Sequence, residues 1–326
     1  MMSLPCLGID VSKRTLSAAL LIDPAKKPKR KTVSNDARGY DALLKWLAYH
    51  RVERVHACME ATSTYAHGVA RHLYAQGHTV TIANPKQVKS YGESLLVRTK
   101  NDHIDAAIIA QFCAERRPHP WTPPSPDVEE LQALARRLAA LDKMLTAERN
   151  RLETAPVSLV DDITTHVDFL KQQKQAVLDK IKRHISTHDG LKHQRDLIVS
   201  IPGIGETTAA ILLAEIGDIS CYKSARQLAA HAGVTPKEHS SGTSIHKKTR
   251  LSKIGNARLR RALYMPALAA ITWNPAIEQF RQRLLDAGKC KMQIVGAIMH
   301  KLIRFVFGVL HSDKPFDLDI ALAKQA

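Results

Sequence analysis

The 326-residue sequence predicts an α/β N-terminal domain, a helical hairpin or coiled coil in the middle, and a mainly α-helical C-terminal domain. In residues 6–83, short apolar runs alternate with amphipathic segments, which is the pattern of strands separated by helices. Residues 118–126 (PHPWTPPSP) hold five prolines and cannot continue a helix. Leucines then recur at helical spacing. We therefore expect domains at 1–125, 126–192 and 193–326.

The charge balance indicates a polyanionic partner. Lys and Arg number 48 against 31 Asp and Glu, a formal net charge of +17, which favours nucleic acid over a membrane surface. The most apolar stretch, residues 293–310, is interrupted by His300, Lys301 and Arg304, and the N-terminus lacks the basic start of a signal peptide. The five cysteines form no CxxC pair and are typical of buried thiols in a reducing cytoplasm.

The first domain is expected to hold strands and helices in alternation. The first two strands are close enough for a hairpin. Helices are expected from the N-cap region 34–36 to Tyr49 and over residues 65–75, the second closed by Gly77. Strands separated by helices favour a largely parallel sheet, in which ligands gather at the carboxyl ends of the strands. The expected strands are 6–9, 15–22, 31–33, 52–59 and 78–83.

Four acidic residues stand where such a sheet would place a site. Asp10 and Glu60 each follow an apolar run, and Asp102 and Asp105 begin a predicted amphipathic helix after a basic segment. Residues three apart share a helix face, so the last two can point at one spot. Carboxylates suit Mg²⁺ or Mn²⁺, and two such ions can hold the attacking and leaving oxygens of a phosphoryl transfer. Taken singly, each acid could also be a loop residue or a carboxylate that favours the positive end of a helix dipole. The four acids together predict a metal site.

The middle segment predicts two long helices joined as a hairpin. The break falls at Ala155-Pro156, and charged residues flank the apolar seam on either side. Two alternatives stay open: the hairpin dimerises the chain, or it packs on its own body. Three histidines lie at roughly helical spacing here, but no cysteine or acid completes a zinc site, so we expect them to be solvated: His184, His188 and His193. The apolar positions are Leu131, Leu134, Leu138, Leu141, Leu145 and Leu152, then Ile163, Val167, Leu170, Val177 and Ile181.

The third domain contains a glycine turn between two helices. Residues 197–217 read LIVSIPGIGETTAAILLAEIG, and PGIG joins an apolar helix end to an Ala-rich helix. This pattern is typical of a helix–hairpin–helix, where Gly203 and Gly205 allow the tight turn and free N–H groups grip a phosphate without reading sequence. Similar turns also join purely structural helix pairs.

A basic segment follows, with eight Lys or Arg and one acid, Glu238, in residues 237–261. Its centre, residues 240–244 (SSGTS), is expected to be flexible and to expose hydroxyl groups; alternatively it is a linker whose hydroxyls are only capping or solvated. The expected nucleic-acid-binding residues of this domain are Gly203, Gly205, Lys247, Lys248, Arg250, Lys253, Arg258, Arg260 and Arg261.

Six short motifs resemble one known family. They are GIDVSK (8–13), MEAT (59–62), KNDHIDA (100–106), GVTP (233–236), the pair Ser241-Gly242, and LSKIGNARLRRALY (251–264). The chain resembles the DEDD insertion-sequence transposases of the bridge-RNA-guided type. Their N-terminal domain is ribonuclease-H-like and similar to the Holliday-junction resolvase RuvC. The resemblance spans most of the chain and is least distinctive in the middle helices.

The resemblance implies roles for five residues. Asp10, Glu60, Asp102 and Asp105 would be the catalytic tetrad that binds Mg²⁺ or Mn²⁺, and Ser241 the nucleophile. It also implies double-stranded donor and target DNA and a structured guide RNA. We further expect a homo-oligomer, either dimer or tetramer, in a prokaryotic cytoplasm at the nucleoid. The general base stays open, because too many candidates flank the serine: His239, His246, Lys247 and Lys248.

The expected function is a DNA transposase or recombinase that exchanges strands through a serine–DNA link. Two alternatives remain. A metal-dependent junction nuclease would use the acids and water and leave Ser241 idle, and a non-catalytic nucleic-acid-binding scaffold would carry the acids for structural reasons. Stimulation of strand breakage by Mg²⁺ separates both enzymes from the scaffold. A covalent protein–DNA adduct separates the two enzymes.

Overall fold

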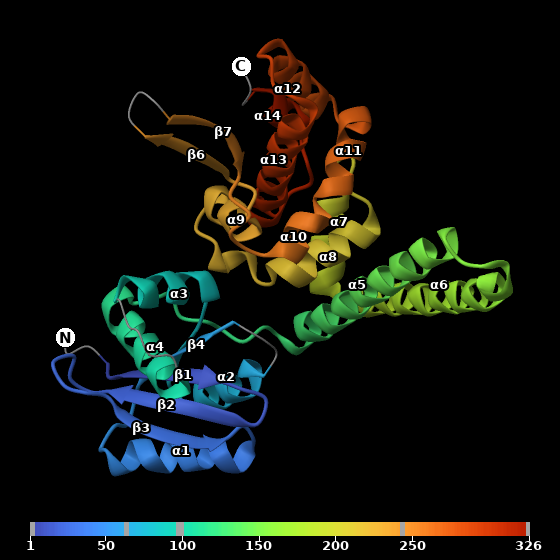
Figure 1. Cartoon of the computed structure of the whole chain (residues 1–326). Coiled ribbons are helices and arrows are strands. Elements are labelled where there is room, and N and C mark those ends of the chain that lie inside the picture. Colours follow the sequence, from blue (N-terminus) through green and yellow to red (C-terminus); the bar gives the residue numbers. More distant parts are fainter. Residues whose placement is uncertain (1–3, 62–64, 96–100, 242–244, 324–326) are drawn as a thin grey trace. The chain divides into compact units, whose positions relative to one another are not determined.

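The chain forms two compact units, Met1–Pro123 and Pro124–Ala326, in a computed structural model. The structure describes residues 4–61, 65–95, 101–241 and 245–323 (Figure 1), and the side chains of residues 238–249 lie outside that description. Whether the second unit divides further at residue 192 stays a prediction.

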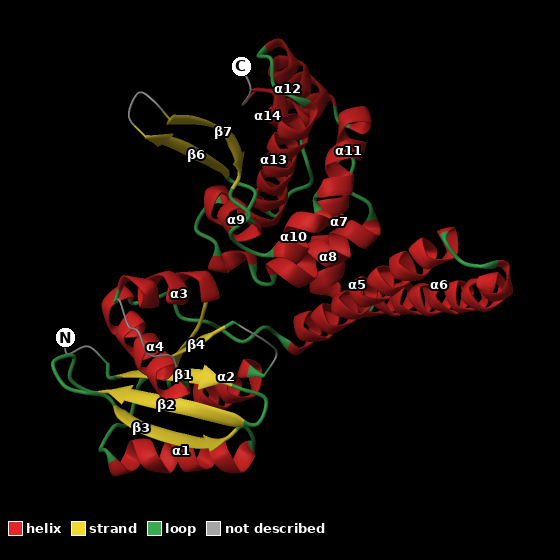
Figure 2. Ribbon diagram, viewed as in Figure 1, coloured by secondary structure: helices red, strands yellow, loops and turns green. Residues whose placement is uncertain are grey.

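The first unit is built on a mixed five-stranded sheet with the order β3-β2-β1-β4-β5 (Figure 2). The sheet is less parallel than predicted, because β1, β2 and β3 are joined by connections too short for a crossover and therefore pair antiparallel. Only β4 and β5 continue parallel to β1. The strands are β1 (Cys6–Val11), β2 (Thr15–Leu21), β3 (Lys29–Ser34), β4 (His56–Glu60) and β5 (Thr79–Ala83).

Helices cover both faces of this sheet. Alternate residues of a strand point to opposite faces, so Leu7 and Ile9 of β1 pack with α1 (Ala37–Tyr49) and α2 (Ala66–Ala75). Cys6 faces the other side, with α3 (Pro85–Ser94) and α4 (Asp102–Arg116). A mixed sheet between two helical layers is compatible with a ribonuclease-H-like fold.

The predicted elements of the first unit are largely confirmed, with two differences. The helix ending at Tyr49 begins after Asp36, whose side chain accepts from the backbone N–H of Gly39. Strand β4 starts at His56 instead of residue 52, since the chain is still closing the preceding helix where Val52 donates to the carbonyl of Leu47. Helix α3 was not predicted, because its apolar positions are few: Val88 and Tyr91 are its buried residues.

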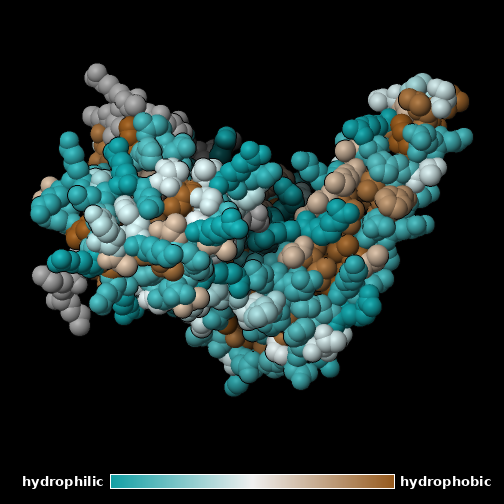
Figure 3. Space-filling model, turned by 90° about the horizontal axis from the view of Figure 1, so that it is seen from below, coloured by the Kyte–Doolittle hydropathy of each residue, from teal (hydrophilic) through white to brown (hydrophobic). Residues whose placement is uncertain are grey.

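The second unit begins with two long helices, α5 (Pro126–Glu153) and α6 (Val157–Ser186), that lie side by side (Figure 1). Leu138 and Leu145 of α5 share a buried core with Leu170 and Ile181 of α6, so the apolar seam is used within the chain. Figure 3 shows hydrophobic surface that remains on this helix pair. Its large exposed apolar residues are Met144, Val157, Leu159 and Phe169.

The rest of the second unit packs around α13 (Lys291–Ser312), whose Leu302 and Val306 are fully buried. By length and composition α13 is the one helix in the described part of the chain that could cross a membrane, and 56% of its apolar window is buried inside the protein. The other elements are α7 (Asp189–Val199), α8 (Glu206–Ile216), η1 (Ile219–Cys221), α9 (Ala225–Ala232), β6 (Pro236–Ser241), β7 (Ile245–Leu251), α10 (Ala257–Ala262), α11 (Tyr264–Trp273), α12 (Pro275–Asp286) and α14 (Leu318–Ala323).

Candidate active site

Two of the predicted acids lie at the carboxyl ends of neighbouring parallel strands. Ile9 of β1 is in register with Met59 of β4, so the next residues, Asp10 and Glu60, follow side by side at the same end of the sheet. Both are half-buried, and each makes a polar or electrostatic contact. Because side chains alternate along a strand, Asp10 shares the face of Gly8, which is the face that α4 covers.

Helix α4 lies directly on β1, and glycine makes this possible. A Cβ atom on Gly8 would stand 2.1 Å from the carbonyl oxygen of Ala106 and 2.3 Å from the nitrogen of Ala110. Further along α4, the Cys113 thiol donates to the carbonyl of His56, where β4 begins, at 3.5 Å. The helix therefore runs antiparallel to β1 and β4, and its first turn lies toward their carboxyl ends.

The other two predicted acids are in that first turn. Asn101, which the sequence reading missed, is the N-cap: its side chain accepts from the N–H of Ile104 at 2.9 Å. Asp102 and Asp105 therefore do not serve as the cap, although they still favour the positive end of the helix. Asp102 precedes the buried Ala106 by four residues, so it is on the side of the helix that faces the sheet.

The structure thus places Asp10 and Glu60 at one end of the sheet and turns the start of α4, with Asp102 and Asp105, toward that end. Oxygen donors of this kind fit a hard divalent cation, and an offsetting cation relieves their mutual repulsion. Within the described residues, no three His, Cys, Asp or Glu side chains are grouped closely enough to hold a metal ion as they stand. Residues 62–64 and 96–100, which adjoin Glu60 and α4 and include Arg98, lie outside the described residues.

The segment that carries Ser241 is a strand, which the sequence reading did not predict. Ser241 ends β6 and is paired with Ile245 of β7, and Ser240 is paired with His246. Antiparallel pairing satisfies backbone groups that an open linker would leave to water, so residues 240 and 241 are not part of a flexible loop. The Ser241 hydroxyl, the candidate bases beside it and residues 242–244 lie outside the description.

Two motif glycines close the base of this β6–β7 hairpin. Gly233, with φ of +68°, precedes β6, and its carbonyl accepts from the N–H of Lys253 at 3.1 Å. Gly255, with φ of +138°, follows β7, and a Cβ there would stand 2.2 Å from the carbonyl oxygen of His231. Both positions therefore require glycine, which explains two residues of the GVTP and LSKIGN motifs physically.

The glycine turn between α7 and α8 also has a structural cause. Gly203 has φ of +99°, and a Cβ there would stand 2.7 Å from the backbone of Ala270 in α11. Gly205 is the N-cap of α8, and a Cβ there would meet nothing within 4 Å. Contact between a DNA phosphate and the N–H groups at the N-terminus of α8 stays a prediction.

The predicted basic residues divide into two groups. Arg258 Nε donates to Glu215 Oε1 at 2.6 Å, and Arg260 Nη1 donates to the carbonyl of Ala232 at 3.3 Å, so both have partners within the protein. Arg250, Lys253 and Arg261 are exposed and can reach solvent. The side chains of Lys247 and Lys248 lie outside the description.

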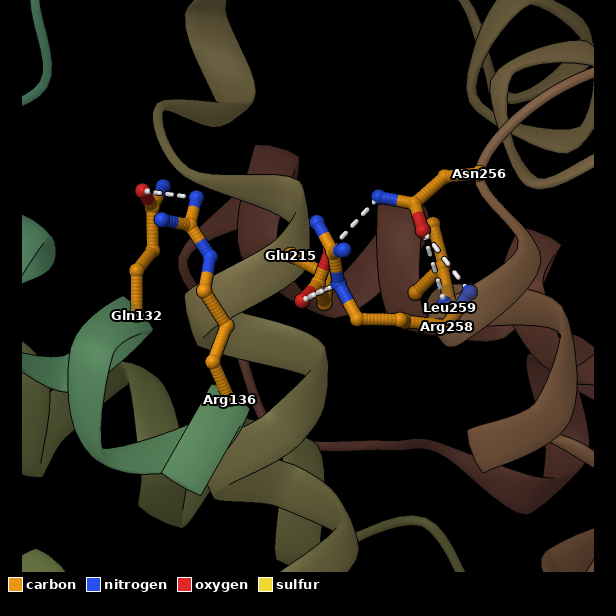
Figure 4. Close-up of polar contacts among 6 residues, drawn as sticks. All are labelled: Gln132, Arg136, Glu215, Asn256, Arg258 and Leu259. Atoms are coloured by element: carbon orange, nitrogen blue, oxygen red, sulfur yellow. Dashed lines mark hydrogen bonds and ion pairs between the residues drawn. The ribbon is translucent and has the colours of Figure 1, made fainter. Parts of the chain in front are cut away.

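One polar cluster escaped the sequence reading. Glu215 of α8 accepts from both Arg258 and Asn256, which flank the start of α10 (Figure 4). The available signal was a single acid in the otherwise apolar run AAILLAEI, residues 209–216. An isolated charge in such a run indicates a buried partner.

The comparisons with known proteins agree with this architecture. Residues 7–157 match a family model of DEDD-type transposases, described as "Transposase", and residues 195–282 match "Transposase IS116/IS110/IS902 family". A pilin gene-inverting protein of Moraxella bovis is 35% identical over 323 residues, covering 97% of this chain and 98% of the relative. The transposase of insertion sequence element IS1328 of Yersinia enterocolitica is 30% identical over 230 residues, covering 61% of this chain and 66% of the relative.

The family models and these relatives define a DNA transposase or recombinase. The chain belongs to the IS116/IS110/IS902 family of insertion-sequence transposases. A DEDD domain implies dependence on a divalent metal ion. Which residues hold that ion stays a prediction, and the four acids named from the sequence are the candidates.

Proposed function

We propose that this transposase exchanges DNA strands through a covalent serine–DNA intermediate, with Ser241 as nucleophile and the four acids as ligands of Mg²⁺ or Mn²⁺. The metal assignment is supported by the placement of Asp10 and Glu60 at the same end of the sheet, and by the first turn of α4, with Asp102 and Asp105, lying toward that end. The assignment of Ser241 rests on its motif and on its place at the end of β6, beside the connection to β7.

The chemistry is a pair of transesterifications. The Ser241 oxygen attacks a DNA phosphorus atom, a P–O bond to the serine forms, and the P–O bond to a DNA hydroxyl breaks. The serine proton leaves to a base that the sequence leaves open, and a hydroxyl of a second DNA strand then reverses the step. When bound, the divalent ion stabilises the negative charge that develops on the transferring phosphoryl group.

The substrates proposed are double-stranded donor and target DNA. The formal net charge of +17 and the exposed Arg250, Lys253 and Arg261 support contact with phosphates. The Moraxella relatives are named for inverting a pilin gene, and inversion also requires cutting and rejoining strands. A structured guide RNA is proposed from the family resemblance, with basic surface as its support in this chain.

We also propose a homo-oligomer, dimer or tetramer, acting in the cytoplasm at the nucleoid. The exposed apolar residues of the α5–α6 pair, Val157 and Phe169 among them, support this proposal, because exposed apolar surface commonly marks an interface. Since the seam itself is filled within the chain, the contact would use the outer surface of the helix pair.

Strand transfer by purified protein tests the metal assignment. Glu60→Gln and Asp105→Asn should abolish Mg²⁺-dependent transfer and leave the unfolding transition near that of the wild type, because each removes a charge from a cluster of like charges. Asp168→Asn is the matched control, since Asp168 is exposed and pairs with Lys171 one turn away on the same helix, α6. Wild-type transfer by either tetrad variant would remove that residue from the mechanism, and Mg²⁺-independent binding without breakage would favour the scaffold.

A further inference from the structure

Glu215 lies where a carboxylate is unfavourable without partners. Its side chain is 4% exposed, and it stands in the last turn of α8 (Glu206–Ile216), at the negative end of the helix dipole. Burying an ionised carboxylate costs free energy that only close, well-oriented donors offset. A buried carboxylate at this position therefore indicates that its hydrogen-bond partners are important for the structure or the function of the protein.

Both carboxylate oxygens of Glu215 are used, and both bonds lead to the same segment. Oε1 accepts from Arg258 Nε at 2.6 Å, and Oε2 accepts from Asn256 Nδ2 at 2.7 Å. Figure 4 shows the two side chains converging on Glu215 from the start of α10. We call Glu215, Asn256 and Arg258 the clamp.

Asn256 ties the clamp to the chain on either side of the β6–β7 hairpin. Its Oδ1 caps α10 by accepting from the N–H groups of Arg258 and Leu259. Its own N–H donates to the carbonyl of His231, just before β6, at 2.6 Å. The strand that leaves the hairpin is thus fixed against the segment that enters it.

Two further bonds close the hairpin base beside the clamp. The N–H of Ser252 donates to the carbonyl of Thr235 at 2.9 Å, and the N–H of Lys253 donates to that of Gly233 at 3.1 Å. The two strands above this base are β6 (Pro236–Ser241) and β7 (Ile245–Leu251). The orientation of the whole hairpin is therefore set where the clamp acts.

The hairpin acts as a lever for Ser241. Ser241 is five residues beyond Pro236, and at about 3.4 Å per residue this is about 17 Å from the base. A tilt of about 3° at the base would move Ser241 by about 1 Å. Misplacing a reacting group by about 1 Å can cost about 100-fold in rate.

We infer that Glu215 is a positioning residue for strand transfer, which holds the base of the β6–β7 hairpin through Asn256 and Arg258 and so aims Ser241. This inference rests on the proposed role of Ser241 as nucleophile. Glu215 touches neither DNA nor metal in this account. Its effect falls on the rate of adduct formation and not on DNA affinity.

The full-length protein with Mg²⁺ and a double-stranded DNA carrying the insertion-sequence ends tests the inference. Glu215→Gln keeps the size of the side chain but loses the charge that holds Arg258. Asn256→Asp keeps the cap of α10 but places a second carboxylate against Glu215. Glu278→Gln is the matched control, because Glu278 also binds an arginine, Arg281, at 2.6 Å, but within α12 and away from the hairpin.

Three quantities are measured for each variant: amide hydrogen exchange at Ser252, Lys253 and Asn256 relative to α13, DNA affinity, and the rate constant of covalent adduct formation at saturating DNA. Glu215→Gln and Asn256→Asp should speed exchange at least about 10-fold and slow adduct formation about 10- to 100-fold, with affinity within about twofold of wild type. The control should match wild type in all three. A purely structural ion pair would lower the folded fraction and leave the rate constant of the folded protein unchanged.

The outcomes separate the inference from the proposed function. Unchanged exchange in Glu215→Gln overturns the clamp whatever the DNA chemistry. Faster exchange with a wild-type rate constant overturns the positioning role. If the wild type forms no adduct that depends on Ser241, the proposed function fails and the positioning role with it, while the exchange data still decide whether the clamp holds the hairpin.

Discussion

The close approach of α4 to β1 makes Gly8→Ala the most informative single change in the first unit. The added Cβ would stand 2.1 Å from the carbonyl oxygen of Ala106, whereas real Cβ atoms essentially never come within 3.0 Å. The helix backbone must therefore retreat by about 0.9 Å (3.0 − 2.1). Because both close neighbours are backbone atoms, no side-chain rotation can relieve the contact.

The retreat has two expected consequences. Overfilling a packed core costs about 1–3 kcal/mol, and the rigidity of both neighbours places Gly8→Ala near the upper end. The first turn of α4 also moves relative to Asp10 and Glu60, and a shift of about 1 Å at reacting groups should slow strand transfer about 100-fold. The assays are denaturant unfolding and single-turnover strand transfer with Mg²⁺.

Gly92→Ala is the control for this change. Gly92 is in α3, and its added Cβ would be 3.4 Å from the flexible Ile108 side chain, an ordinary contact. The replacement should stabilise the protein by about 0.5–1 kcal/mol through helix propensity. If Gly8→Ala unfolds and transfers strands as the wild type does, the packing of α4 on β1 described above is wrong.

Three further predictions concern the second unit and its assembly. Arg261→Ala should weaken DNA binding and flatten its salt dependence. Arg258→Ala should chiefly lower the unfolding midpoint, because it leaves the buried carboxylate of Glu215 without its cation. Equal salt slopes for the two variants would contradict the assignment of Arg261 to DNA and of Arg258 to Glu215. Gly203→Ala should destabilise the protein by at least about 2 kcal/mol in denaturant unfolding, and a neutral effect would contradict the turn geometry. Mixing Asp10→Ala with Ser241→Ala protein should restore some strand transfer if the serine acts in trans, while no recovery would indicate a site made within one chain.

The sequence could predict the positions of the acids because the signal is local. Asp10 and Glu60 each end an apolar run, and Asp102 and Asp105 share a helical spacing. The orientation of α4 relative to β1 could not be predicted from a local sequence pattern. It depends on the contact of Gly8 with Ala106 across the core, which no local pattern reports.

The hairpin and the clamp show the same limit. Residues 236–251 are rich in Lys, His, Ser and Thr and lack the alternation of apolar and polar residues that marks a half-buried strand. The sequence therefore carries no pattern that predicts the pairing of β6 with β7. Glu215 and Asn256 are 41 residues apart in sequence and meet only because α8 and α10 pack together. The role of the buried Glu215 can be inferred only from its contacts with Asn256 and Arg258, which the sequence does not reveal.

The central claim is that Ser241 forms the covalent link to DNA. The most direct test traps the wild-type reaction with a double-stranded DNA carrying the insertion-sequence ends and Mg²⁺, digests the protein, and locates the nucleotide-bearing peptide by mass spectrometry. The account predicts a phosphodiester on Ser241, lost in Ser241→Ala and retained in Ser240→Ala. An adduct on Ser240 or another residue, or strand breakage with no adduct, would contradict it, and breakage without an adduct would assign the acids to a water-using nuclease.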